Sequence, residues 1–351
     1  MKKKDAVLKL WRECFNDSDQ YVDMFFSEVY RDDDALLLEQ DNRPISSMLL
    51  QRYAMNFHGV TISVSYVCGA ATTRDSRDRG CMSALMREAL RESYDRGDAF
   101  CTLIPANELL YHYYGHFCFS PVFYVDTERY TSAHTFRHHG VYERYDALDS
   151  HEAYSFFHRM MEQRRCTVQH TEEQYRYILM DNSADAGIVA AIADGAGEPV
   201  AMAFAVPVDG EAVVKDVLAI DEDAREAVLD EVHREFADMP VTVYGYYNSD
   251  CGELQPRGMA RIINAGKCLS IISAAYPKMR LALRLSDPVI EENNATFIIS
   301  DGTCRRDGQY TGKLDYDIDI EVLTSIIFGN DVTRRILDFP AVRPFISLML
   351  D

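Results

Sequence analysis

One short unit constrains the fold of this chain more than any other: an apolar strand, a charged loop, an amphipathic helix and a second apolar strand. The strand is "TISVSYVCGAATT", rich in β-branched and aromatic residues, and the loop that follows contains "RDSRDRG". Apolar residues then recur in steps of three and four over residues 82–96, which predicts a helix, and "AFCTLI" predicts the next strand. The unit therefore predicts a βαβ crossover in an α/β domain.

The charged loop lies where a fold of this kind can bind an anion. A helix N-terminus offers N–H groups without intrahelical partners, and the helix dipole adds partial positive charge there. Gly80 allows close approach of the backbone to a ligand, and Arg77 and Arg79 can donate charge-assisted hydrogen bonds. A pyrophosphate fits this description, and a solvated turn with an ordinary cap is the alternative. The P-loop and Rossmann glycine patterns are both absent from the sequence.

Composition limits the partners and the compartment. The net charge of -20, from 56 acidic and 36 basic residues, argues against nucleic acid and is compatible with a cationic amine, although acidity can also serve solubility alone. The 9 cysteines lie mostly in apolar runs without a CxxC pair, so we expect free thiols and no metal site. No apolar run approaches the roughly 20 residues of a membrane helix, and no signal-peptide core is present. We therefore expect a cytoplasmic protein without a membrane partner.

The rest of the chain predicts two further domains. The middle third repeats the α/β plan, with three strands in "GIVAAIADGAGEPVAMAFAVPVDGEAVVKDVLAI", then a helix and the strand "VTVYGYY". The segment "DEDA" before that helix has no glycine and no arginine, so the second domain lacks a phosphate loop. The last third mixes helices and strands. The predicted domains are residues 1–127, 128–250 and 251–351.

The first of these domains resembles a known family. The segment from "VCGAATTRDSRDRGCM" to "YHYYGHFCF" is similar to the central motif of the GNAT acyltransferases, and within them to the enhanced intracellular survival (Eis-like) N-acetyltransferases. The sequence departs from the pattern at Met82, where Gly or Ala is usual in the superfamily, and at Asp78, where the Eis-like branch often has a basic residue. The resemblance implies two tandem GNAT-like α/β domains followed by an α+β domain like sterol carrier protein.

The resemblance also implies roles in binding acetyl-CoA and in releasing its thiol. The backbone of Ala70 and Thr72 would hold the pantetheine and acetyl group, because these positions match the strand before the loop. The loop positions would hold the pyrophosphate; they are Arg77, Asp78, Arg79, Gly80 and Cys81. The segment "ELLYHYYGHF" is similar to the one that carries the family's catalytic tyrosine, so Tyr111 would be the general acid that protonates the thiolate. Tyr113 and Tyr114 are predicted to pack in the core.

The end of the chain is the implied general base. In the family the α-carboxylate of the last residue, here Asp351, accepts the proton of the amine. The ending "FPAVRPFISLMLD" is similar to that of the family, which leads into the core of the first domain, and its apolar residues are consistent with such an insertion because free tails are usually polar. Asp17 matches an acidic family position near the amine pocket, and a helix N-cap for the segment starting near Ser18 is the alternative interpretation.

The predicted function is acetyl transfer from acetyl-CoA to a primary amine. The acceptor would be a polyamine-like or aminoglycoside-like small molecule, or a lysine side chain. A lipid-binding carrier that uses the third domain and an acyltransferase with a longer acyl donor are the alternatives. The Eis-like resemblance further implies a homo-oligomer, hexamers included.

Overall fold

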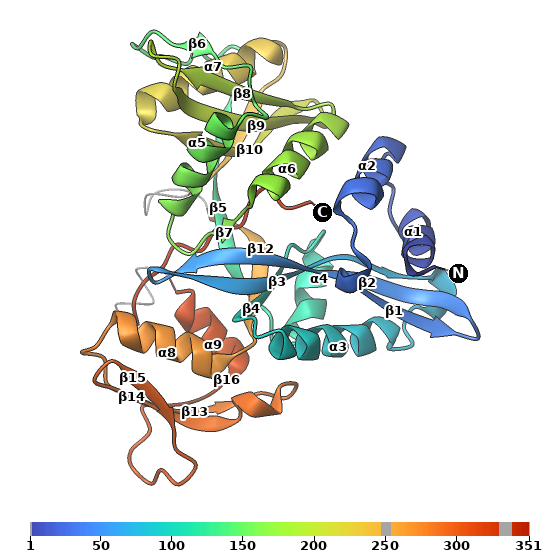
Figure 1. Ribbon diagram of the computed structural model, residues 1–351, viewed down its shortest axis with the longest axis vertical. Coiled ribbons are helices and arrows are strands. Elements are labelled where there is room, and N and C mark those ends of the chain that lie inside the picture. The colour runs from blue at the N-terminus through green and yellow to red at the C-terminus, as the bar shows by residue number, and fades with distance from the viewer. Residues whose placement is uncertain (1, 247–253, 330–338, 351) are drawn as a thin grey trace.

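The first domain is a sheet with helices on both faces (Figure 1). The computed structural model describes residues 2–246, 254–329 and 339–350 of the chain. The elements of this domain are α1 (Lys3–Cys14), α2 (Asp19–Met24), a π-helical turn (Phe25–Val29), β1 (Ala35–Gln40), β2 (Arg43–Phe57), β3 (Val60–Thr72), α3 (Cys81–Asp95), β4 (Phe100–Leu103), α4 (Glu108–Gly115) and β5 (Ser120–Tyr130). The strands and the helix predicted around the charged loop are confirmed.

Alternating side chains of β2 and β3 separate two cores. Leu49 and Tyr53 of β2 and Tyr66 of β3 face the core that contains α1 and α2. Leu50 of β2 and Val67 of β3 face the core that contains α3. This period of two lets both faces of the sheet be buried.

The predicted βαβ crossover is present, and its two strands separate near the charged loop. β3 and β4 are parallel and pair from Val64 with Phe100 to Val67 with Leu103. β3 then continues to Thr72, beyond the end of β4. Within the described residues, the last part of β3 therefore pairs with β2 on one side and with no strand on the other.

The second domain has the predicted α/β plan. Its elements are β6 (Glu143–Arg144), α5 (His151–Glu162), β7 (Val168–Gln169), α6 (Glu172–Ala184), β8 (Ile188–Ala193), β9 (Pro199–Val208), β10 (Glu211–Ala219), α7 (Glu222–Glu235) and β11 (Val241–Gly245). Asp221 is the N-cap residue of α7, and its carboxylate accepts from Ala224 N at 2.9 Å. The N-terminus of α7 is therefore capped by the side chain of Asp221, whereas the corresponding helix of the first domain, α3, begins after the charged loop with its glycine.

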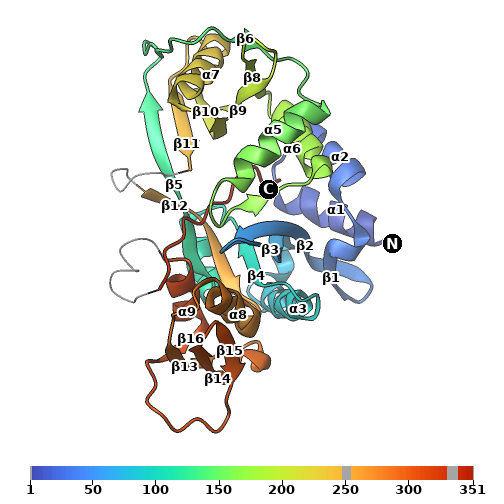
Figure 2. The same cartoon turned by 60° about the vertical axis from the view of Figure 1, so that its left-hand side comes forward.

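The two α/β domains share one sheet of twelve strands. Its order is β1-β2-β3-β4-β12-β5-β11-β10-β9-β8-β6, with β7 paired to β2. β5 pairs with β12 near its start and with β11 near its end, so it crosses residue 127, where the sequence predicts a boundary. β12 comes after residue 250 in the chain but lies between β4 and β5 (Figure 2). The three-domain division of the sequence stays a prediction.

The third domain is an α+β unit attached through β12. Its elements are β12 (Leu254–Ile262), α8 (Ala265–Ala275), β13 (Leu281–Ser286), β14 (Ala295–Ser300), β15 (Thr303–Arg306), β16 (Tyr316–Asp319) and α9 (Ile320–Ile327), and β13–β16 form a four-stranded sheet of their own. No helix of the described residues is long and apolar enough to span a membrane. The eight cysteines within the described ranges are free thiols, as predicted.

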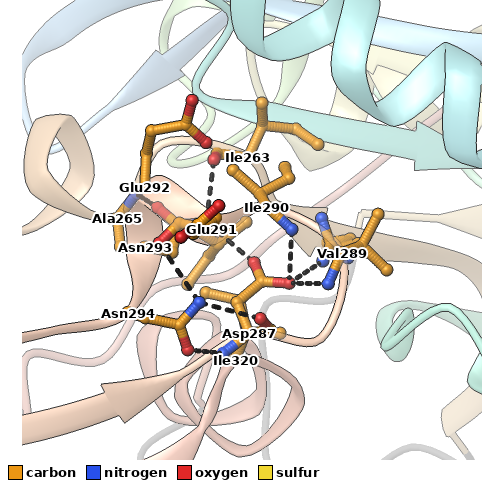
Figure 3. Close-up of polar contacts among 12 residues, drawn as sticks. Ile263, Ala265, Asp287, Val289, Ile290, Glu291, Glu292, Asn293, Asn294 and Ile320 are labelled. Atoms are coloured by element: carbon orange, nitrogen blue, oxygen red, sulfur yellow. Dashed lines mark hydrogen bonds and ion pairs between the residues drawn. The ribbon is translucent and has the colours of Figure 1, made fainter.

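A buried polar cluster fixes this attachment (Figure 3). Asn293 accepts from Ala265 N at 3.0 Å and donates to Ile263 O at 3.0 Å, both just after β12. It also donates to Asp287 at 2.8 Å. Asp287 in turn accepts from Arg261 of β12 at 2.5 Å, and neither of these two charged side chains is exposed. Breaking a buried pair of this kind is strongly destabilising, so the cluster holds the third domain to the shared sheet.

Candidate active site

A groove of about 550 Å³ opens at the charged loop. Its walls come from the end of α1, the end of β3, the loop, the start of α3 and helix α4. Six of the seven predicted acetyl-CoA residues line it, namely Ala70, Thr72, Arg77, Asp78, Gly80 and Cys81. Arg79 is exposed and is not part of the lining. The structure thus brings the strand and loop positions together around one space.

The N-terminus of α3 faces this groove without a side-chain cap. Gly80 is the N-cap residue, with φ of 78°, and it makes no side-chain cap hydrogen bond to the N–H groups of the first turn. Residues 80–83 all line the groove. A Cβ at Gly80 would meet nothing within 4 Å, so the space over the helix end is open. Free N–H groups and the helix dipole make this end suitable for a phosphate group.

The end of β3 is held rigidly beside the groove. The Thr72 carbonyl accepts from Arg77 Nε at 3.2 Å and from the Cys14 thiol at 3.4 Å. On the other edge, the buried Ser46 hydroxyl donates to Ala71 O at 3.0 Å. Arg77 therefore couples the loop to the strand and also adds positive charge to the groove wall. Asp78 places a carboxylate in the same wall, with φ of 60°.

Trp11 connects Asp17 to the irregular part of β3. The register of β2 and β3 shifts between Ser47 and Leu49, opposite Gly69. A Cβ at Gly69 would lie 2.2 Å from the Trp11 ring, so only glycine fits under it. The Trp11 indole N–H donates to Asp17 Oδ2 at 2.7 Å. Ser18 and not Asp17 caps α2, because its hydroxyl accepts from Tyr21 N at 3.1 Å, so the N-cap interpretation of Asp17 is wrong.

The three tyrosines of α4 take different positions. Tyr113 and Tyr114 line the groove, whereas Tyr111 does not. The Tyr111 hydroxyl donates to the carbonyl of Pro256 in β12 at 3.2 Å. Burial raises the pKa of Tyr114 to about 12. Burial also raises the pKa of Tyr111, and the positive charge of Arg257 opposes that rise.

The C-terminal tail, residues 339–350, runs between the first two domains (Figures 1 and 2). Ile346, Met349 and Leu350 are 1%, 6% and 2% exposed and belong to the core of α1, α2 and β3. Leu348 is 7% exposed and packs in the second domain. The predicted insertion of the apolar ending is therefore confirmed. Asp351, the predicted base, lies outside the described residues.

A larger hollow of about 800 Å³ lies elsewhere and shares no lining residue with the groove. It is lined by the turn between β2 and β3, the end of α5, Tyr276 and Val342 of the tail. The antiparallel register places that turn at one end of β2 and β3 and the groove at the other. Its size alone therefore does not make it the reaction site.

Known families match two parts of the chain. Residues 1–121 match the family model described as an acetyltransferase (GNAT) domain, and residues 269–338 match that of a sterol carrier protein domain. Residues 1–121 are a GNAT acetyltransferase domain. The protein is thus an acyltransferase with a sterol-carrier-like third domain, as the resemblance implies. Curated proteins give no match to this chain.

Solved structures show the same fold over the full GNAT-containing chain. A probable N-acyltransferase from Enterococcus faecalis V583, a conserved protein of unknown function, is 14% identical with a TM-score of 0.79 and covers 99% of this chain and 97% of its own. Eis1 from Mycobacterium abscessus is 13% identical with a TM-score of 0.73 and covers 99% and 97%. A GCN5-related N-acetyltransferase from Kribbella flavida is 17% identical with a TM-score of 0.73 and covers 99% and 95%. The chain therefore shares its overall fold with these structures, Eis1 among them.

Sequence reasoning missed part of the groove of this GNAT domain. Cys14 and Phe15 line it from the end of α1, almost 60 residues before the loop. Gly69 inside a strand was the available signal, because a glycine there indicates close approach of another group. Tyr113 and Tyr114 were assigned to the core, and both also form the groove wall.

Proposed function

We propose that the protein transfers an acetyl group from acetyl-CoA to a primary amine. The observation that carries the proposal is the open N-terminus of α3 in a groove that also contains Arg77 and the end of β3. Acetyl-CoA supplies an activated thioester together with a pyrophosphate that needs such a cradle. Gly80 to Ser83 would donate backbone N–H groups to it, and Arg77 would add a charged hydrogen bond.

The acceptor is an amine that arrives as a cation. A net charge of -20 favours the approach of such a molecule over that of an anion. Asp17 does not line the groove but is joined to the strand beside it through Trp11, so we propose it as a carboxylate that attracts this cation. A polyamine, an aminoglycoside or a lysine side chain would all satisfy this chemistry.

Tyr111 is the proposed general acid. As the amine nitrogen bonds to the acetyl carbon and the carbon–sulfur bond breaks, the leaving thiolate takes a proton. A donor with a pKa near that of the thiol suits this step. Arg257 limits the rise in the pKa of Tyr111, whereas burial raises the pKa of Tyr114 to about 12. Tyr114 is the alternative general acid, because it lines the groove and Tyr111 does not.

The α-carboxylate of Asp351 is the proposed general base, which takes the proton of the ammonium before or during attack. The buried path of Met349 and Leu350 toward the core around Trp11 supports this role. That path also favours acetyl transfer over a lipid carrier, since the tail packs on the first domain instead of filling only the third. The homo-oligomer implied by the family stays a prediction, which light scattering of the purified chain would test.

A thiol-release assay with acetyl-CoA and a panel of amines tests the proposal. Release that depends on a primary amine supports it, and release with a long-chain acyl-CoA alone would favour the longer-acyl alternative. One glycine added after Asp351 displaces the terminal carboxylate by about 3.5 Å and should abolish turnover while coenzyme A binding is retained. The same glycine placed at the N-terminus is the matched control. Unchanged turnover of the extended chain would remove the terminus from the reaction.

A further inference from the structure

The C-terminal tail is held by buried polar side chains of the second domain. The Ser347 hydroxyl donates to Asp216 Oδ2 at 2.7 Å, and the Ser347 carbonyl lies 3.1 Å from His170 Nε2. Ser347, Asp216 and His170 are 6%, 0% and 3% exposed. Because a carbonyl can only accept, His170 must carry its proton on Nε2. The hydroxyl and the carbonyl of Ser347, four positions before Asp351, are thus both bound to buried side chains.

The Asp216 carboxylate accepts hydrogen bonds from three residues, one of which is Ser347 of the tail. Arg164 donates to both of its carboxylate oxygens at 2.7 Å, and Val217 N donates to Oδ1 at 2.7 Å. With Ser347 these bonds fill the roughly four acceptor positions of a carboxylate. The register of β10 shifts between Val214 and Asp216, which is a bulge of the kind that redirects a side chain. The strand is therefore shaped locally to present this carboxylate inward.

Arg164, which holds Asp216, also contacts the tail directly. Its guanidinium lies 5.0 Å from the centre of the Phe345 ring and 5.3 Å from that of Tyr246. The Phe345 N–H donates to Cys166 O at 3.1 Å, and its carbonyl accepts from Val168 N at 3.3 Å. The tail is thus also paired by backbone hydrogen bonds beside β7.

The side chains on either side of Ser347 divide between the two domains, with Ile346 in the first-domain core and Leu348 in the second. Leu348 has φ of 55°, a left-handed conformation that costs a residue with a side chain about 1–2 kcal/mol. Leu348 packs in the second domain, whereas Met349 and Leu350 pack in the first. Such a conformation persists only where the surroundings fix it on both sides.

We propose that Arg164, Asp216, His170 and Ser347 form a dock through which the second domain positions the chain terminus for catalysis in the first. The proposal rests on the proposed role of the terminal carboxylate. In this proposal the second domain contributes to the reaction, although the side chain of Asp221 caps its helix α7 and no phosphate loop precedes that helix. None of the four residues lines the groove, so they are positioning residues.

Ser347→Ala tests the dock while it leaves the Arg164–Asp216 pair intact. We expect kcat to fall about tenfold or more, because a misplacement on the order of 1 Å can cost about 10²-fold. The KM for acetyl-CoA should not change. Ser347→Thr keeps a hydroxyl and should restore most of the rate. Ser93→Ala, which removes a buried hydroxyl that donates to Ala89 O at 2.9 Å, is the control for lost stability and should keep the parent kcat.

Combining Ser347→Ala with deletion of Asp351 separates this proposal from the proposed base. If the dock acts through the terminus, Ser347→Ala lowers kcat in the full chain and has no further effect in the shortened one. If deletion of Asp351 abolishes activity but Ser347→Ala in the full chain keeps the parent kcat, the proposed dock is wrong and the proposed base is retained. A shortened chain that stays active would overturn the base. An equal loss of kcat from Ser347→Ala in both backgrounds would overturn the dock, because the loss would then not pass through the terminus.

Discussion

Coenzyme A could bind in the groove, or it could be attracted only by the total positive charge of the loop. Replacing Arg77 and Arg79 one at a time distinguishes these two possibilities. Both arginines belong to the same exposed loop, and each replacement by alanine removes one positive charge. Only Arg77 lines the groove, where its Nε also donates to Thr72 O at 3.2 Å. Coenzyme A should therefore respond to Arg77→Ala and hardly to Arg79→Ala.

The expected sizes follow from the two environments. A hydrogen bond to a charged group contributes about 1.5–3 kcal/mol, so Arg77→Ala should raise the Kd for coenzyme A roughly 10- to 150-fold. Arg79 does not line the groove, so it should act only as an exposed charge, which contributes about 0–1 kcal/mol, and Arg79→Ala should change Kd by about fivefold at most. Arg77→Lys keeps the charge without the planar fork and should fall between these values.

Isothermal titration with coenzyme A at one fixed salt concentration measures all three variants. Thermal unfolding of each variant shows whether the fold is retained, because the Thr72 contact is lost with Arg77. Equal weakening by Arg77→Ala and Arg79→Ala would mean that the loop attracts phosphate only through its total charge. Unchanged affinity of Arg77→Ala would place the coenzyme outside this groove.

Three further predictions test the acid, the strand and the tail. Tyr111→Phe should lower kcat about 10²-fold with acetyl-CoA affinity retained, and a full rate would return Tyr111 to a packing role. Gly69→Ala should lower the free energy of unfolding in urea by about 2–4 kcal/mol, because its Cβ would lie 2.2 Å from the Trp11 ring, whereas Gly59→Ala meets nothing within 4 Å and should cost only about 1 kcal/mol. Burial lowers the pKa of His170 from 6.5 to about 4. The unfolded chain therefore binds more protons between these values, and stability should fall by up to about 3 kcal/mol as the pH is lowered through this window. His170→Gln should flatten that slope, and an unchanged slope would contradict the assignment.

Local patterns in the sequence were sufficient for the elements around the groove. The alternating strand, the glycine at position 80 and the three- and four-residue spacing of α3 depend on neighbours along the chain, so they could be recognised without a structure. The absence of a phosphate loop before α7 could be predicted in the same way, and Asp221 now occupies that helix end.

Contacts between distant segments could not be predicted. β12 enters the sheet between β4 and β5 although more than 120 residues separate it from either strand, and nothing local in "ELQPRGMARI" specifies that position. The difference between Tyr111 and Tyr114 has the same origin, since the partner of Tyr111 is the carbonyl of Pro256 in that strand. Likewise, Ser347 is brought to the Arg164–Asp216 pair of the second domain only by the path of the tail.

A crystal structure of the protein with bound coenzyme A would show directly whether the groove is the cofactor site. We expect the pyrophosphate against the backbone N–H groups of residues 80–83, with Arg77 in contact and the pantetheine along Ala70 and Thr72. Coenzyme A bound instead in the 800 Å³ hollow, or at the start of α7 in the second domain, would contradict it.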